Sequence, residues 1–148
     1  MRQAERILQR EITTRLRFAP LDAVLVPSPN GIFLPTRSVS ERDLVRRIVF
    51  RLKQDGALTP GAPDLLFLWN GGSGCMELKR PAEKTILGRQ SAGQLSDDQR
   101  IFRDRCQQLG INYEVVMSWP QARDLLKEWG RLPANWQDAE QRLSRRAS

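Results

Sequence analysis

The stretch GAPDLLFLWNGGSGCMELK, residues 61–79, decides how this chain folds. Two runs, Asp64–Trp69 and Cys75–Lys79, flank the glycine-rich segment NGGSG at 70–74. Apolar runs on either side of such turn residues predict a β-hairpin. The run LLFLW at 65–69 is apolar at every position, which is typical of a strand covered on both faces. The hairpin is therefore predicted to lie inside the core.

Three charged side chains stand at the open end of this hairpin: Asp64, Glu77 and Lys79. If the turn is centred near Gly71 and Gly72, Asp64 lies almost opposite Lys79. Because side chains alternate between the two faces of a strand, this register puts all three on one face. Two carboxylates can hold a divalent cation, and a lysine can stabilise charge on a phosphodiester. Judged by spacing alone, the three residues are slightly more typical of exposed strand charges than of a functional site. A one-residue slip in the register would also separate them. Their position beside a buried strand nevertheless favours a functional site.

Periodic apolar residues predict further elements on both sides of the hairpin. Helices are expected at 2–17, 40–54, 96–109 and 120–130, and strands at 22–26 and 112–118. The segments 27–35 and 80–94 are expected to be loops. The order of the elements predicts an α/β fold in which a mixed central sheet is flanked by helices.

The composition limits the partners and the metal ligands that the chain can use. A net charge of +7 over 148 residues suits a polyanionic partner. The chain has no histidine, so a metal site must use oxygen ligands, which suits Mg²⁺ or Mn²⁺. The apolar runs are too short to cross a bilayer and the start lacks a signal-peptide core, so we expect a cytoplasmic protein with no membrane partner. Cys75 and Cys106 are expected to be buried thiols.

Two polar residues fall on apolar helix faces. Glu5 lies about 20° from Ile12 and from Leu16 on the first helix, which indicates a partner cation or metal. Fraying of this terminal turn would instead leave Glu5 solvated. Gln99 lies on the apolar side of the third helix, and the segment from Ser96 to Gln99 also fits a capping box. The same glutamine can lie on the apolar side of the helix and take part in the capping box.

Three motifs in this order resemble the VRR-type (virus-type replication-repair) nuclease domain of the PD-(D/E)XK superfamily. They are GAPD at 61–64, ELK at 77–79 and LSDDQ at 95–99. The pair Glu5 and Gln9, and Asn30-Gly31 after the first strand, are similar to the family's small standalone phage and bacterial members. The resemblance implies a restriction-endonuclease-like core at 1–130. The residues after it, 131–148, are expected to form a basic C-terminal tail.

The resemblance implies a metal-dependent DNA endonuclease that uses Mg²⁺ or Mn²⁺. It assigns metal ligation to Asp64 and Glu77, catalysis to Lys79, support of the active site to Gln99, and a helix-borne acid to Glu5. Glu11 stays an alternative for that acid. Standalone members look like Holliday-junction resolvases and tend to be homodimers, so branched DNA and a second copy are the expected partners. A non-catalytic DNA-binding module on a nuclease-like fold is the alternative function.

Overall fold

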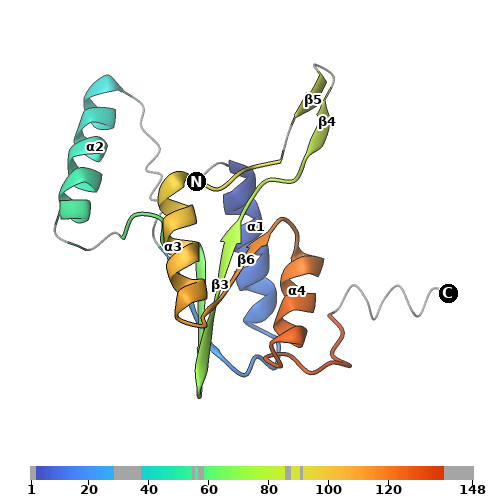
Figure 1. Ribbon diagram of the computed structural model, residues 1–148. Coiled ribbons are helices and arrows are strands. Elements are labelled where there is room, and N and C mark those ends of the chain that lie inside the picture. Colours follow the sequence, from blue (N-terminus) through green and yellow to red (C-terminus); the bar gives the residue numbers. More distant parts are fainter. Residues whose placement is uncertain are drawn as a thin grey trace.

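The computed structural model describes residues 3–28, 38–54, 56, 59–85, 88–90 and 92–138. Figure 1 shows their arrangement in space. The elements are α1 (Gln3–Leu16), β1 (Val24–Pro27), α2 (Val39–Gln54), β2 (Leu65–Trp69), β3 (Gly72–Leu78), β4 (Glu83–Thr85), β5 (Gly88–Gln90), α3 (Asp97–Gln108), β6 (Asn112–Val116) and α4 (Trp119–Glu128). Most of the predicted loop at 27–35, with Asn30-Gly31, lies outside the described residues.

A four-stranded mixed sheet with the order β1-β2-β3-β6 forms the centre of the fold. β1 and β3 both pair antiparallel to β2, whereas β6 runs parallel to β3 after the α3 crossover. The helices α1 and α4 pack on one face of the sheet, and α3 packs on the other. The predicted α/β fold with a mixed sheet flanked by helices is confirmed at this level.

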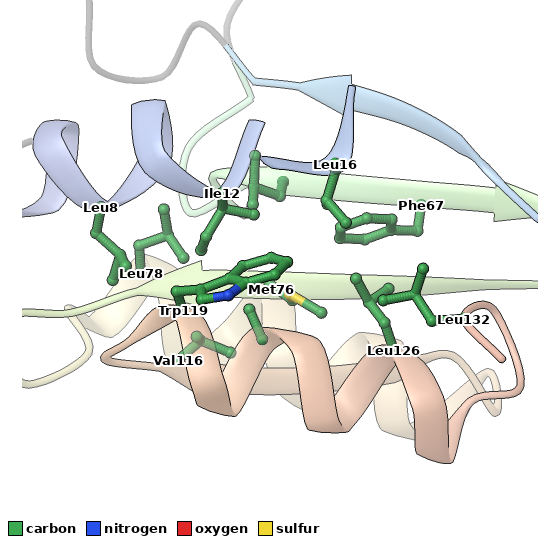
Figure 2. Packing of buried hydrophobic residues seen from close by; sticks show 12 residues of the cluster. Leu8, Ile12, Leu16, Phe67, Met76, Leu78, Val116, Trp119, Leu126 and Leu132 are labelled. Atoms are coloured by element: carbon green, nitrogen blue, oxygen red, sulfur yellow. The ribbon is translucent and has the colours of Figure 1, made fainter. Parts of the chain in front are cut away.

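The main core lies between the sheet and the pair α1 and α4 (Figure 2). The four-residue repeat in α1 aligns Leu8, Ile12 and Leu16 in one stripe, which packs on β2 and β3 side chains such as Phe67 and Met76. A smaller cluster on the opposite face joins β3 and β6 to α3. Both cysteines lie in this smaller cluster as buried free thiols, as predicted.

The hairpin register differs from the predicted one by two positions. Trp69 pairs with Gly72, so the turn consists of Asn70 and Gly71. Gly71 has φ of +81°, a left-handed conformation that favours glycine. The last pair at the open end is Leu65 with Met76, which places Asp64 beside Glu77, and the prediction that it lies opposite Lys79 was wrong. Because the register is shifted by an even number of residues, each side chain still lies on its predicted face of the sheet.

Two predictions about neighbouring segments were also wrong. The segment 80–94 was expected to be a loop, but it contains the antiparallel pair β4 and β5 (Figure 1). The run LLFLW was expected to be covered on both faces, but Leu68 is 42% exposed. The cause is the position of α3, which packs over Cys75 and Tyr113 on β3 and β6 and leaves the end of β2 open.

The second helix forms where it was predicted, but its apolar residues do not pack into the core. Leu44 is 53% exposed and Ile48 is 42% exposed. In Figure 1, α2 stands clear of the sheet. Amphipathicity predicted the helix correctly but did not predict what its apolar face would contact. The side chains of Val45 and Val49 lie outside the described part of the chain.

The first part of the expected C-terminal tail belongs to the folded domain. Leu132 is buried in the main core. Trp136 packs edge-on against Trp119, with ring centroids 6.3 Å apart, and the buried carboxylate of Asp138 accepts a 2.6 Å hydrogen bond from the Trp119 indole. Residues 139–148 lie outside the described residues. None of the described helices is long and apolar enough to span a membrane.

Candidate active site

The two acidic residues predicted as metal ligands are buried side by side at the open end of the hairpin. Asp64 is 7% exposed and Glu77 is 2% exposed. The backbone N–H of Leu78 donates a 2.9 Å hydrogen bond to Oδ2 of Asp64. The carbonyl of Asp64 accepts a 2.8 Å hydrogen bond from the N–H of Ser28 and a 3.2 Å hydrogen bond from Nε2 of Gln9. The position of Asp64 is therefore fixed by contacts from β3, α1 and the end of β1.

Lys79 and Gln99 complete a compact polar group around Glu77. Nζ of Lys79 lies 2.9 Å from Oε1 of Glu77 and donates a 2.8 Å hydrogen bond to Oε1 of Gln99. Nε2 of Gln99 donates a 2.5 Å hydrogen bond to the same Oε1 of Glu77. Each of the three side chains contacts the other two, so the structure brings Glu77, Lys79 and Gln99 together as the sequence predicted.

The N-terminus of α3 holds Gln99 in this position. Ser96 caps the helix by accepting a hydrogen bond from the N–H of Gln99. The side chain of Gln99 completes the capping box by accepting a 2.9 Å hydrogen bond from the N–H of Ser96. Gln99 therefore has both predicted contacts at once. Gly61 packs directly against this turn, because a Cβ atom built there would lie 2.2 Å from the carbonyl oxygen of Asp98. This close contact joins the GAPD and LSDDQ motifs.

The acid on the first helix that approaches the site is Glu5. It is buried, at 8% exposed, on the same stripe as the core leucines of α1. Burial is the main cause of the raised pKa of Asp64 and of Glu77, and the negative charge of Glu5 adds to both shifts. Glu11, the alternative acid, instead pairs with Arg15 at 3.0 Å, with its side chain 38% exposed. Of the two candidates, the structure brings only Glu5 toward Asp64 and Glu77.

Burial and nearby negative charge raise the pKa of both carboxyl groups. Burial, followed by the charge of Asp64, raises the pKa of Glu77 to about 7, against the opposing effect of Lys79. Burial also raises the pKa of Asp64, although the Leu78 N–H and Lys79 act in the other direction. The charged forms are thus disfavoured in the protein alone, so a bound proton or a cation would relieve the repulsion.

The oxygen atoms at the site fit a divalent cation. Within the described part of the chain, Oε2 of Glu77 is buried and has no hydrogen-bond partner. Across the same residues, no three Asp, Glu, Cys or His side chains converge as a ready-made metal cage. Mg²⁺ is commonly held by one or two carboxylates, with water and substrate phosphate filling the other positions. Asp64 and Glu77 meet that requirement.

One buried cation beside the site was not singled out from the sequence. Arg80 is 9% exposed and directly follows Lys79. Its carbonyl accepts a 2.9 Å hydrogen bond from the N–H of Gly93, which brings the far end of the 80–94 segment back to β3. Strand alternation is the signal that was available, because Arg80 has the parity of the core residues Met76 and Leu78.

No family model, curated protein or solved structure matches this chain. The resemblance to the VRR-type domain rests on the three motifs, which the fold brings together around Glu77. The functional assignment rests on those residues and their contacts.

Proposed function

We propose that this chain is a metal-dependent DNA endonuclease with a PD-(D/E)XK core of the VRR type. The observation that carries the proposal is the buried group formed by Asp64, Glu77 and Lys79. Burying two carboxylates close together costs stability, and buried ionisable groups with shifted pKa values cluster at functional sites. Oε2 of Glu77, which is buried without a hydrogen-bond partner in the described part of the chain, is the atom that most directly supports Glu77 as a metal ligand.

Each residue of the group has a distinct role in this mechanism. Asp64 and Glu77 would hold the cation, which when bound would polarise the phosphodiester and activate a water molecule. Gln99 and Lys79 both contact Oε1 of Glu77, which orients the carboxylate and directs Oε2 away from them. Lys79 is itself held by Gln99, so its ammonium group is positioned to stabilise negative charge developing on the phosphate.

Glu5 and Gln9 connect the first helix to the same group. Gln9 fixes the backbone of Asp64, and Glu5 adds a third negative charge nearby. That charge strengthens the attraction for a divalent cation without completing a three-carboxylate cage. The role proposed for Glu5 is therefore to increase cation affinity at Asp64 and Glu77.

DNA is the proposed substrate because the chain carries a net charge of +7, which favours binding to a phosphate backbone. A two-fold homodimer would present two such sites to two strands, as symmetric cleavage of a branched junction requires. The preference for junctions and the dimer are carried over from the motif resemblance.

Cleavage assays test the proposal directly. Plasmid, linear duplex and four-way-junction DNA are incubated with Mg²⁺, with Mn²⁺, or with EDTA. We expect metal-dependent cleavage that falls at least about a hundredfold in Glu77→Ala and Lys79→Ala. Asp104→Asn is the matched control, because Asp104 is an exposed acid in the C-terminal half of α3. Full activity in Glu77→Ala or Lys79→Ala would rule out the proposed site.

The alternative is a DNA-binding module that has kept a nuclease-like fold without catalysis. The intact set of Asp64, Glu77 and Lys79 favours the enzyme, since a degenerate site tends to lose a member. Salt-dependent DNA binding with no cleavage of any substrate under any metal would favour the module.

A further inference from the structure

Helix α2 presents a face that combines exposed apolar and basic side chains. Leu44, Arg47, Ile48 and Arg51 are spaced three and four residues apart, so they share one face of the helix. All four are exposed, and all four border a surface hollow of about 660 Å³. No other described helix or strand packs extensively against α2. An apolar stripe left open in this way indicates a binding surface.

A groove lined by acidic side chains lies between α4 and the edge strand β6. Figure 1 shows α4 and β6 on the opposite side of α3 from α2. The volume of the groove is about 320 Å³. Along α4, Asp124, Leu125 and Glu128 repeat the spacing found in α2, with acids at the positions of the α2 arginines. Val115 of β6 adds a partly exposed apolar side chain, and Glu114 adds a third acid. Asp124 also pairs with Arg123 of its own helix at 2.7 Å, whereas Glu114 and Glu128 supply the other two carboxylates of the groove. A groove with acidic and apolar lining suits a basic amphipathic helix.

We propose that α2 of one copy packs into the α4–β6 groove of a second copy, and that two copies exchange these helices. The two faces match in pattern. Arg47 and Arg51 are one helical turn apart, as are Asp124 and Glu128, and Ile48 stands between the arginines as Leu125 stands between the acids. Reciprocal exchange closes a dimer with two-fold symmetry.

A second copy is the occupant we propose, because a short link holds α2 on the opposite side of α3 and the sheet from the groove of its own chain (Figure 1). Four residues, 55–58, join the end of α2 to Thr59, and such a link spans at most about 18 Å. Gly61, two residues further, is packed against the N-terminus of α3. Both α3 and the sheet stand between α2 and α4 (Figure 1). The inference adds the two surfaces to the homodimer proposed above, and it does not depend on nuclease activity.

Charge reversal tests the exchange. One protein carries Arg47→Glu with Arg51→Glu, and another carries Asp124→Lys with Glu128→Lys. In each protein alone, α2 and the groove now have like charge, whereas a mixture of the two restores opposite charge at both contacts. Sedimentation velocity should find a dimer for the unmodified chain, dissociation constants raised at least about a hundredfold for each variant alone, and a dimer again in the mixture. Circular dichroism of each variant checks that the fold is kept.

Several outcomes would overturn the inference. The unmodified chain could be a monomer at about 100 μM, each variant alone could remain a dimer, or the mixture could fail to recover. Arg47→Glu with Arg51→Glu could also weaken binding to a duplex oligonucleotide while leaving the dimer intact, which would make α2 a DNA contact instead. Metal-dependent cleavage is measured on the same samples, so loss of the dimer interface and loss of the proposed active site are told apart.

Discussion

The stability of the metal-free protein should fall as the pH rises, because of Glu77. Its pKa is about 7 in the folded protein, against an ordinary value of 4.5. Below pH 4.5 the carboxyl group of Glu77 is protonated in both the folded and the unfolded protein, so it does not lower the free energy of unfolding. Above pH 7 the group is ionised in the folded protein as well, and the full destabilisation is reached. Each pH unit between these values is worth about 1.4 kcal/mol, so the free energy of unfolding should drop by about 2–3 kcal/mol from pH 5 to pH 8. For a chain of this length, that lowers Tm by about 4–12 °C.

Urea unfolding in EDTA at pH 5, 6, 7 and 8 measures this effect. Glu77→Gln removes the titrating group whose raised pKa causes the slope, so the profile should flatten by at least half. Asp104→Asn, an exposed acid, should keep the slope of the unmodified chain. Comparison of Glu77→Gln with the unmodified chain isolates the effect of Glu77, because the two proteins have every other carboxyl group in common.

A divalent cation should reverse the loss at pH 8. Saturation at about one hundred times the dissociation constant adds about 2.7 kcal/mol to the free energy of unfolding. Glu77→Gln should gain much less, because it lacks the anionic ligand. An identical pH slope in Glu77→Gln and in the unmodified chain would refute the reasoning, since the buried charge of Glu77 would then have no measurable cost.

Two further substitutions test the neighbours of the site. Glu5→Gln should raise the metal concentration needed for half-maximal cleavage by about tenfold, whereas Glu11→Gln should leave it unchanged; equal effects in a metal titration would contradict the placement of Glu5. Gly61→Ala should destabilise the fold by at least twice the roughly 1 kcal/mol expected for Gly56→Ala in urea unfolding, because both have positive φ but only Gly61 lies against a backbone carbonyl. Equal losses would mean that the contact between Gly61 and α3 is absent.

The hairpin and its charges could be predicted from the sequence because their signals are local. Turn residues fix where the chain reverses, and strand alternation then decides which side chains share a face. The exact pairing was wrong by two positions, because the segment NGGSG allows more than one turn and only Asn70-Gly71 is used. The grouping of Asp64, Glu77 and Lys79 survived since it depends on parity alone.

What the elements pack against could not be predicted in the same way. The stripe of α2 is as amphipathic as that of α1, yet Leu44 is exposed while Ile12 is fully buried. Periodicity states that a helix has an apolar face, but not whether that face meets its own sheet or another molecule. The pairing of β4 with β5 was missed for a related reason, because the polar sequence of 80–94 carries no apolar alternation.

The site itself was predictable only in part. The three motifs could be named, and helix geometry placed Glu5 and Gln99 on inward faces. The contact of Gln9 with the Asp64 carbonyl, and the double use of Gln99 as a cap and as a partner of Lys79, depend on distances between elements that no single segment encodes. Contacts of this kind orient the carboxylate ligands in a metal site.

A crystal of the protein soaked in Mn²⁺ tests the central claim most directly. Anomalous scattering locates the ion without reference to any assumed chemistry. The proposed site requires a peak bound by a carboxylate oxygen of Asp64 and by Oε2 of Glu77, and the peak should disappear in Glu77→Gln. A peak held by other residues, or none at saturating Mn²⁺, would contradict the assignment of these carboxylates as a metal site.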